Sequence, residues 1–176
     1  MVIITDIKLI EKLAEERADE NWRFRTYLKG YGIDELDAIV QRLYADVSSQ
    51  IDCQACGNCC RVMHPILKQN DIIRLSSCLS ISQDEFEEQY LAKDEDGDLT
   101  FRETPCPFLS DNSCSVYQNR PNDCRSYPHL HKKEIVFRLM GVVCNYSVCP
   151  IVFNVYEQLK DELRGEDEEY SFDDYE

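Results

Sequence analysis

The sequence lacks an apolar run of the roughly 20 residues that a helix needs to cross a bilayer. Its longest apolar stretch, from Ile135 to Cys144, is short and is interrupted by Arg138. The first residues also lack the basic stretch followed by an apolar one that marks a secretory signal. We therefore expect a cytoplasmic protein with no membrane partner, in a compartment where thiols stay reduced.

Basic residues are few: 19 Lys and Arg stand against 34 Asp and Glu, and the formal net charge is −15. Because this average field repels phosphates, we expect no nucleic-acid partner. Residues 161–176 carry nine acids and one arginine, net −8. Residues 165–176 have too little apolar surface to form a core and are expected to be a disordered acidic tail.

The common catalytic motifs are missing as well. The sequence has no Ser–His–Asp order, phosphate-binding loop, HExxH pair or glycine-rich Rossmann turn, so its catalytic residues stay unknown. Residues 94–98 loosely resemble a calcium loop, but their glycine is fourth where an EF-hand has it sixth. Calcium is therefore disfavoured.

Helical periodicity is clear outside the cysteine-rich segments. Asp6 is a candidate N-cap, Ser82 and Glu85 fit a capping box, and Pro150 suits the first turn of a helix. Helices are predicted over residues 6–29, 34–49, 70–78, from Ser82 to about 92, and 150–164. Short strands are expected over 99–102 and 134–139.

The expected fold class is mainly α, with a cysteine-rich irregular region and two short strands, in one metal-stabilised domain. That domain would span residues 1–164. Its parts are a helical N-terminal pair (6–51), a cysteine-cluster region (53–149) and a C-terminal helix (150–164).

Ten cysteines are the most informative feature of the chain. A C-x-x-C-x-x-C-C block is formed by Cys53, Cys56, Cys59 and Cys60. Two-residue gaps let thiolates converge on one centre, and bacterial ferredoxins combine such a triplet with a distant Cys-Pro step. Here Cys106 and Cys149 each precede a proline. Adjacent thiolates such as Cys59 and Cys60 point different ways, which indicates two metal centres or a multinuclear one.

A second group of cysteines lies in a segment rich in Pro, Asn, Asp and Ser, and consists of Cys106, Cys114, Cys124, Cys144 and Cys149. A long irregular segment is hard to hold in a compact domain, and metal crosslinks would hold it. One of Cys144 and Cys149 is expected to be a ligand, and Cys149 is preferred. Cys78 lies in a predicted helix with apolar neighbours and is expected to be no ligand.

Histidines and arginines lie near the cysteines in the sequence. His64, His129 and His131 are possible ligands, but a lone histidine is more often outside the ligand set. For the arginines, the expected role is to relieve the negative charge of metal-bound thiolates, and the alternative is a surface ion pair. These candidate cofactor-binding residues are Arg61, Arg120 and Arg125.

Four motifs in order carry a family resemblance: CQACGNCC (53–60), PCPFL (105–109), and CSVY and RPNDCRSYP within residues 114–128. The segment 50–150 resembles the CxxCxxCC cysteine-cluster family, also called the zinc- or iron-chelating domain or YkgJ-type protein. The resemblance implies a bacterial metalloprotein and a ligand set of Cys53, Cys56, Cys59, Cys60, Cys106, Cys114 and Cys124. A late cysteine before a proline is similar to Cys149.

Three functions compete. The favoured one is an iron–sulfur protein, with [4Fe–4S] clusters and a redox, sensing or modifying role. The second is a structural zinc protein whose loops bind a protein partner, because thiolates suit zinc equally well. The third is a protein lysine N-methylase or its accessory, since the family includes longer flagellin lysine N-methylases.

Overall fold

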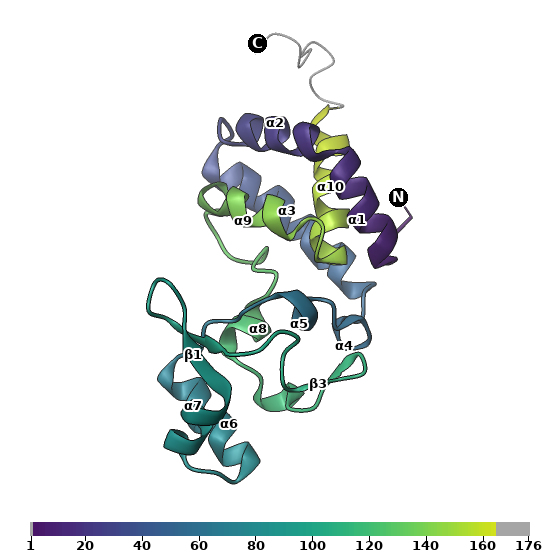
Figure 1. Cartoon of the computed structure of the whole chain (residues 1–176). Helices are drawn as coiled ribbons and strands as arrows, with labels where there is room; N and C mark the ends of the chain where they lie inside the picture. The colour runs from purple at the N-terminus through teal and green to yellow at the C-terminus, as the bar shows by residue number, and fades with distance from the viewer. Residues whose placement is uncertain (1, 165–176) are drawn as a thin grey trace. The chain divides into compact units, whose positions relative to one another are not determined.

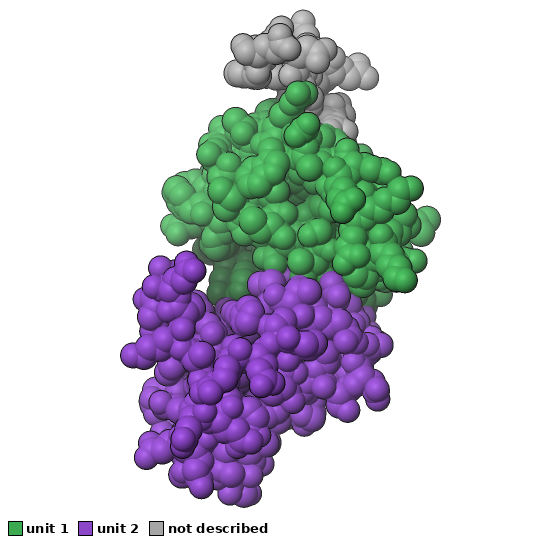
Figure 2. Space-filling model, viewed as in Figure 1, with its two compact units in different colours: residues 1–51, 128–176 green, residues 52–127 purple. Residues whose placement is uncertain are grey.

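The computed structural model describes residues 2–164 of the chain (Figure 1). The acidic tail expected over 165–176 lies outside the described residues. The chain divides into two compact units, shown in green and purple in Figure 2. Unit 1 is formed by residues 1–51 and 128–176, and unit 2 by residues 52–127.

Unit 1 is helical. Its elements are α1 (Ile7–Glu16), α2 (Ala18–Leu28), α3 (Ile33–Ser49), the 3-10 helix η2 (Ile135–Arg138), α9 (Leu139–Asn145) and α10 (Pro150–Arg164). Asp6 accepts a hydrogen bond from the Leu9 amide, which confirms it as the N-cap of α1. The single helix predicted over 6–29 is wrong in one respect, because the helix breaks at Arg17. That residue leaves helical geometry, and its guanidinium pairs with Glu157 of α10.

The centre of unit 1 is α10, which packs on α3, α1 and α9. Its buried apolar side chains include Val152, Phe153 and Leu159. Burial of such side chains against neighbouring helices is the main force that stabilises this unit. The buried Asn154 side chain has partners at the N-terminal segment: it bonds both backbone groups of Ile4.

The strand expected over 134–139 is wrong: the backbone forms η2 there instead. The carboxylate of Asp37, on α3, accepts the amide N–H groups of Glu134 and Ile135 at 2.6 and 2.8 Å. Two amides held by one carboxylate favour the start of a helical turn over an extended strand. Periodicity alone does not reveal this long-range cap.

Unit 2 combines short helices with two β-hairpins. Its elements are α4 (Cys53–Cys56), α5 (Cys59–Val62), α6 (Gln69–Leu79), α7 (Gln83–Tyr90), β1 (Leu91–Lys93), β2 (Leu99–Phe101), β3 (Leu109–Ser110), β4 (Ser113–Cys114), η1 (Tyr117–Asn119) and α8 (Asn122–Ser126). The capping box at Ser82 and Glu85 is confirmed. The strand predicted at Leu99 is confirmed as β2, which pairs antiparallel with β1.

One apolar cluster forms the core of unit 2. It contains Leu67, Ile72, Leu75, Phe86, Leu91, Phe101, Phe108 and Val116. Cys106 and Cys114 pack against this cluster while keeping part of their surface exposed. The cysteine-bearing loops therefore rest on a core that α6, α7 and the β1–β2 hairpin supply.

The structure as a whole is mainly helical, as predicted. Among residues 2–164, no single helix has the length and apolar character to cross a membrane. Only the pair 135–145 and 150–163 passes that test jointly, by length and composition, across a bend of 118°.

Candidate metal centre

The cysteine block begins with two short helical turns. Asp52 caps α4 by accepting the Gln54 amide at 2.9 Å, and Gly57 ends it in the left-handed conformation, with φ +59°. The second turn, α5, carries both Cys59 and Cys60. The sequence thus presents its four thiols from two consecutive turns, which a glycine joins.

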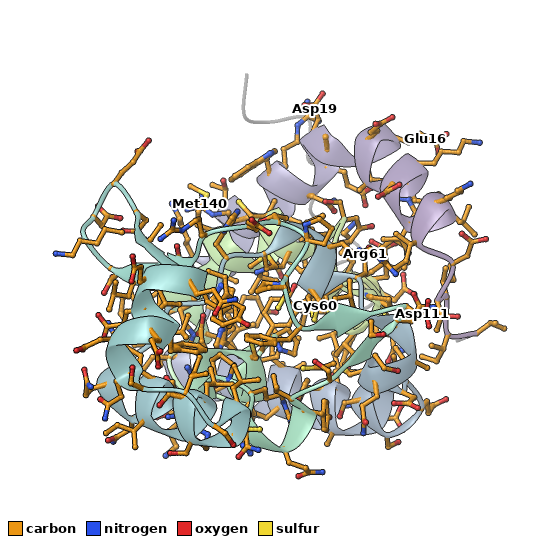
Figure 3. All side chains as sticks on the ribbon, turned by 60° about the horizontal axis from the view of Figure 1, so that its bottom comes forward. Glu16, Asp19, Cys60, Arg61, Asp111 and Met140 are labelled. Carbon is orange, nitrogen blue, oxygen red and sulfur yellow. The ribbon has the colours of Figure 1, made fainter. Side chains whose placement is uncertain are left out.

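The block packs against the segment that contains Cys106 and the β3–β4 hairpin. The Cys106 amide donates to the Cys60 carbonyl at 2.7 Å. Arg61 donates to the Asp111 carbonyl at 2.8 Å and also binds the Asn112 side chain; Cys60, Arg61 and Asp111 are labelled together in Figure 3. A Cβ on Gly57 would lie 2.6 Å from the Asn112 carbonyl oxygen. Segments about 50 residues apart are therefore packed closely here.

Four thiols from four separate motifs form one group, which we call the thiol tetrad: Cys60, Cys106, Cys114 and Cys124. Burial is the main cause that raises the pKa of the other three thiols, and the charge of Cys60 raises each of these pKa values further. The charge of Cys114 raises the pKa of Cys106, and both raise the pKa of Cys124. All six pairs in the tetrad therefore lie close enough to interact electrostatically.

The tetrad is not electrostatically uniform. A hydrogen bond with Cys59 lowers the pKa of Cys60 to about 7, against the effect of burial and with help from the Arg61 charge. Burial raises the pKa of Cys106 to about 11 and that of Cys124 to about 12, and it also raises the pKa of Cys114. Cys60 is thus the first of the four to become a thiolate, the form that binds metal.

The remaining cysteines of the block lie beside the tetrad in the sequence. Burial raises the pKa of Cys53, and the charges of Cys56 and Asp52 add to this. The thiols of Cys59 and Cys60 are hydrogen bonded to each other. Within residues 2–164, no group of three or more His, Cys, Asp or Glu side chains is arranged to hold a metal ion. The tetrad is therefore a proximity of thiols without single-ion geometry.

Two of the three candidate arginines influence the pKa of the thiols. The charge of Arg61 adds to the hydrogen bond with Cys59 in lowering the pKa of Cys60, and the charge of Arg120 partly offsets the burial that raises the pKa of Cys53 and Cys114. The Arg120 guanidinium also lies over the Tyr117 ring at 3.6 Å. Arg125 instead donates to the Gln118 and Arg120 carbonyls, so its observed contacts are with the loop backbone.

The late cysteines belong to the other unit. Cys144 is exposed on α9, and Cys149 is buried in the core of unit 1, immediately before α10. The Cys149 amide donates to the Asn145 carbonyl at 2.9 Å. The ligand role of Cys149 stays a prediction.

Cys78 and the histidines have other surroundings. Cys78 is exposed, and its sulfur accepts a hydrogen bond from the Asn119 side chain at 3.2 Å. Thr104 lies 2.7 Å from the His64 ring, and His131 lies beside Tyr44. His129 adopts a positive φ of 65°.

Two polar residues of α6, Asp71 and Arg74, were not predicted to contact the cysteine-bearing segments. They form an ion pair with 2.6 Å between Oδ1 and Nη2, and both reach the segment that leads to Cys124. Their signal in the sequence was an acid and a base three residues apart in a predicted helix.

The chain belongs to the CxxCxxCC family, which is described as a "putative zinc- or iron-chelating domain". The family model matches residues 52–145, more than half of the chain. This match confirms the resemblance found in the sequence and supports metal binding in general. It includes Cys144 and ends before Cys149. No curated protein and no solved structure matches the chain significantly.

Proposed function

We propose that the chain is an iron–sulfur protein whose main centre is bound by the thiol tetrad. The observation that carries this proposal is that four motifs, spread over residues 60–124, lie close together in one unit: the Cys106 amide binds the Cys60 carbonyl, and the four thiols influence one another's pKa. Four thiolates are the full protein ligand set of a [4Fe–4S] cluster. The ligand type itself suits zinc as well.

The sequence pattern supports a cluster over a single zinc ion. Cys53, Cys56 and Cys59 repeat the two-residue gap of bacterial ferredoxins, and Cys106 adds a distant Cys-Pro step. Thiolate ligands by themselves suit both metals, so the preference for iron rests on this pattern.

Cys53, Cys56 and Cys59 supply three further thiols, which we assign to a second centre. Adjacent thiols were expected to point different ways, but those of Cys59 and Cys60 are hydrogen bonded to each other, so the second centre would adjoin the first. The proposed role is electron transfer or sensing in the cytoplasm, together with a protein partner. The ten cysteines support a redox role, because thiolate-bound iron–sulfur clusters carry electrons.

The test is an anaerobic purification followed by elemental analysis, acid-labile sulfide determination and an absorption spectrum. We expect iron and sulfide in equal amounts, with the broad visible absorbance of iron–sulfur charge transfer. A colourless protein that contains zinc and no sulfide would overturn the iron–sulfur proposal and favour a structural zinc protein. Replacing Cys60 or Cys114 by Ser should lower the iron content and the visible absorbance by the share of the main centre if the tetrad binds that cluster.

A further inference from the structure

We infer that Asp71 and Arg74 of α6 are positioning residues that hold the segment between Cys114 and Cys124 in the shape required for metal binding. The inference rests on the proposed ligand roles of these two cysteines and holds for either metal. We call the pair and its contacts the α6 clamp.

Arg74 donates hydrogen bonds to the backbone of this segment. Its Nε donates to the Asn119 carbonyl at 3.1 Å, and its Nη2 donates to the Arg120 carbonyl at 2.9 Å. The same Nη2 donates to Asp71 Oδ1 at 2.6 Å. A planar guanidinium can serve these acceptors together, whereas a lysine ammonium cannot reproduce the fork.

Asp71 accepts a hydrogen bond from the residue that begins α8. Its side chain is buried, 1 % exposed, and its Oδ1 accepts the Asn122 amide at 3.0 Å. Asn122 is the first residue of α8, the helix that carries Cys124. Oδ2 accepts the Lys68 amide at 3.1 Å, so the same carboxylate also fixes the start of α6. A buried carboxylate with these partners is costly to remove, because its donors then lose their acceptor.

The clamped segment has little regular structure of its own. Between β4 and α8 only η1, three residues long, is regular. Arginines satisfy the carbonyls that a helix or sheet would otherwise use: Arg74 those of residues 119 and 120, and Arg125 those of residues 118 and 120. Of these two arginines, only Arg74 anchors the segment to a helix of the unit 2 core.

Pre-ordering of the segment has a consequence for the metal. A centre that binds Cys114 and Cys124 must otherwise order the chain between them, and the lost conformational entropy of each residue weakens metal binding. With the clamp in place, α6 has already ordered it. Residues that orient metal ligands without touching the metal typically change metal affinity by about 10–100-fold when they are replaced.

The experiment compares Arg74→Lys and Asp71→Asn with Arg102→Lys in the full chain. Arg102 is a matched control in the same unit, since its Nη2 also binds two carbonyls, those of Glu88 and Leu91, at 2.7 and 2.9 Å. Each protein is purified with its own metal and mixed with the chromogenic chelator 4-(2-pyridylazo)resorcinol. The rate of metal release, the absorption spectrum and the thermal midpoint are recorded for each variant.

We expect Arg74→Lys and Asp71→Asn to release metal about tenfold faster than the unmodified chain, with an altered absorption spectrum. Arg102→Lys should keep the original release rate and spectrum, even if its thermal midpoint falls as much as that of Arg74→Lys. Equal release rates for Arg74→Lys and Arg102→Lys at equal midpoints would overturn the clamp. So would acceleration that follows the loss of midpoint in all three variants.

A parallel Cys124→Ser variant separates the two proposals. If it keeps the metal content of the unmodified chain, Cys124 is no ligand, and the tetrad fails together with the clamp. If it loses metal while Arg74→Lys behaves like Arg102→Lys, the tetrad stands and only the clamp is wrong.

Discussion

Gly57 is the residue of the cysteine block with the least room for a side chain. Its φ of +59° is a left-handed conformation that glycine adopts freely and other residues rarely adopt. A Cβ there would lie 2.6 Å from the Asn112 carbonyl oxygen, a distance that requires one backbone to move. Glycine at position 57 therefore permits two features: the turn between Cys56 and Cys59, and the close approach of the β3–β4 hairpin.

The first prediction concerns Gly57→Ala, which should be destabilised by about 1–3 kcal/mol through backbone strain and should lose metal. Two glycines serve as controls. Gly97 has a φ of +83° in open space, so Gly97→Ala tests strain alone. Gly141 is helical with open space, so Gly141→Ala should stabilise the chain by about 0.5–1 kcal/mol. Urea unfolding and metal content per chain are measured. If Gly57→Ala and Gly97→Ala bind metal equally well, the close approach to Asn112 has no role in metal binding.

The second prediction compares two cysteines of unit 2. Cys124→Ser should lose metal and aggregate, because metal-binding free energy is also folding free energy. Cys78→Ala should keep its metal and change the free energy of unfolding by about 1 kcal/mol or less, since Cys78 is exposed. Elemental analysis of the soluble fraction measures both. A drop in metal for Cys78→Ala would show that the ligand set is drawn too small.

At the scale of elements, the helices were predictable where local signals decide them. The capping box of Ser82 and Glu85 and the apolar stripe of α3 are local, and both were confirmed. The break at Arg17 and the turn at Ile135 were missed because their causes are distant: Glu157 for the first and Asp37 for the second. Contacts across about 100 residues leave no trace in periodicity.

The candidate site divides in the same way. Spacing and family motifs identified seven of the eight cysteines of unit 2 as candidate ligands, all except Cys78. They did not indicate which thiols group together, because Cys60 meets Cys106 through a backbone hydrogen bond between distant segments. The α6 clamp was also missed, since an Asp and an Arg three residues apart are ordinary on a helix surface.

The third prediction concerns pH and the buried polar cluster at α10. Glu157 accepts hydrogen bonds from the Tyr146 hydroxyl, at 2.7 Å, and from Arg17, and Lys160 lies 2.7 Å from it. Burial raises the pKa of Tyr146, and the hydrogen bond to Glu157 raises it further. Burial also raises the pKa of Tyr156, whose hydroxyl donates to the Asn21 carbonyl. In the folded state both phenols therefore keep protons that the unfolded chain releases above about pH 10.

The sign follows from proton linkage: where the folded state holds more protons, the free energy of unfolding falls as pH rises. The stabilisation should be complete below about pH 10 and should decline above it. Urea midpoints measured from pH 8 to 11.5 test this, with tyrosinate absorbance as the monitor. A Tyr146→Phe, Tyr156→Phe double variant should show a flatter decline. An unchanged slope in that variant would assign the alkaline effect to other groups.

At the scale of the whole molecule, the two units differ in what stabilises each of them. Unit 1 is built from both ends of the chain around α10, with a large apolar core. Unit 2 is one continuous segment, 52–127, and contains every predicted ligand except Cys149. Its core is smaller, and its cysteine segments are irregular, so we expect bound metal to contribute more to the stability of unit 2 than to that of unit 1.

The fourth prediction follows from this division. A fragment of residues 52–127 should fold when metal is supplied and should bind as much metal per chain as the complete protein. The reason is that the tetrad and the α6 clamp lie entirely within this segment. Metal content and amide hydrogen exchange of the fragment, with and without a chelator, provide the measurement. Protection in residues 104–127 should fall sharply when the chelator removes the metal.

The same fragment decides the role of Cys149. That residue was predicted as a ligand from its Cys-Pro step, but Pro150 has another use as the first residue of α10, and Cys149 is buried in the core of unit 1. If the fragment binds less metal than the complete chain, the missing thiolate is the one whose replacement in the complete chain, Cys149→Ser or Cys144→Ser, lowers the metal content by the same amount. If the fragment binds the full amount, the Cys-Pro step at 149 reflects the start of a helix, and the metal chemistry belongs to unit 2 alone.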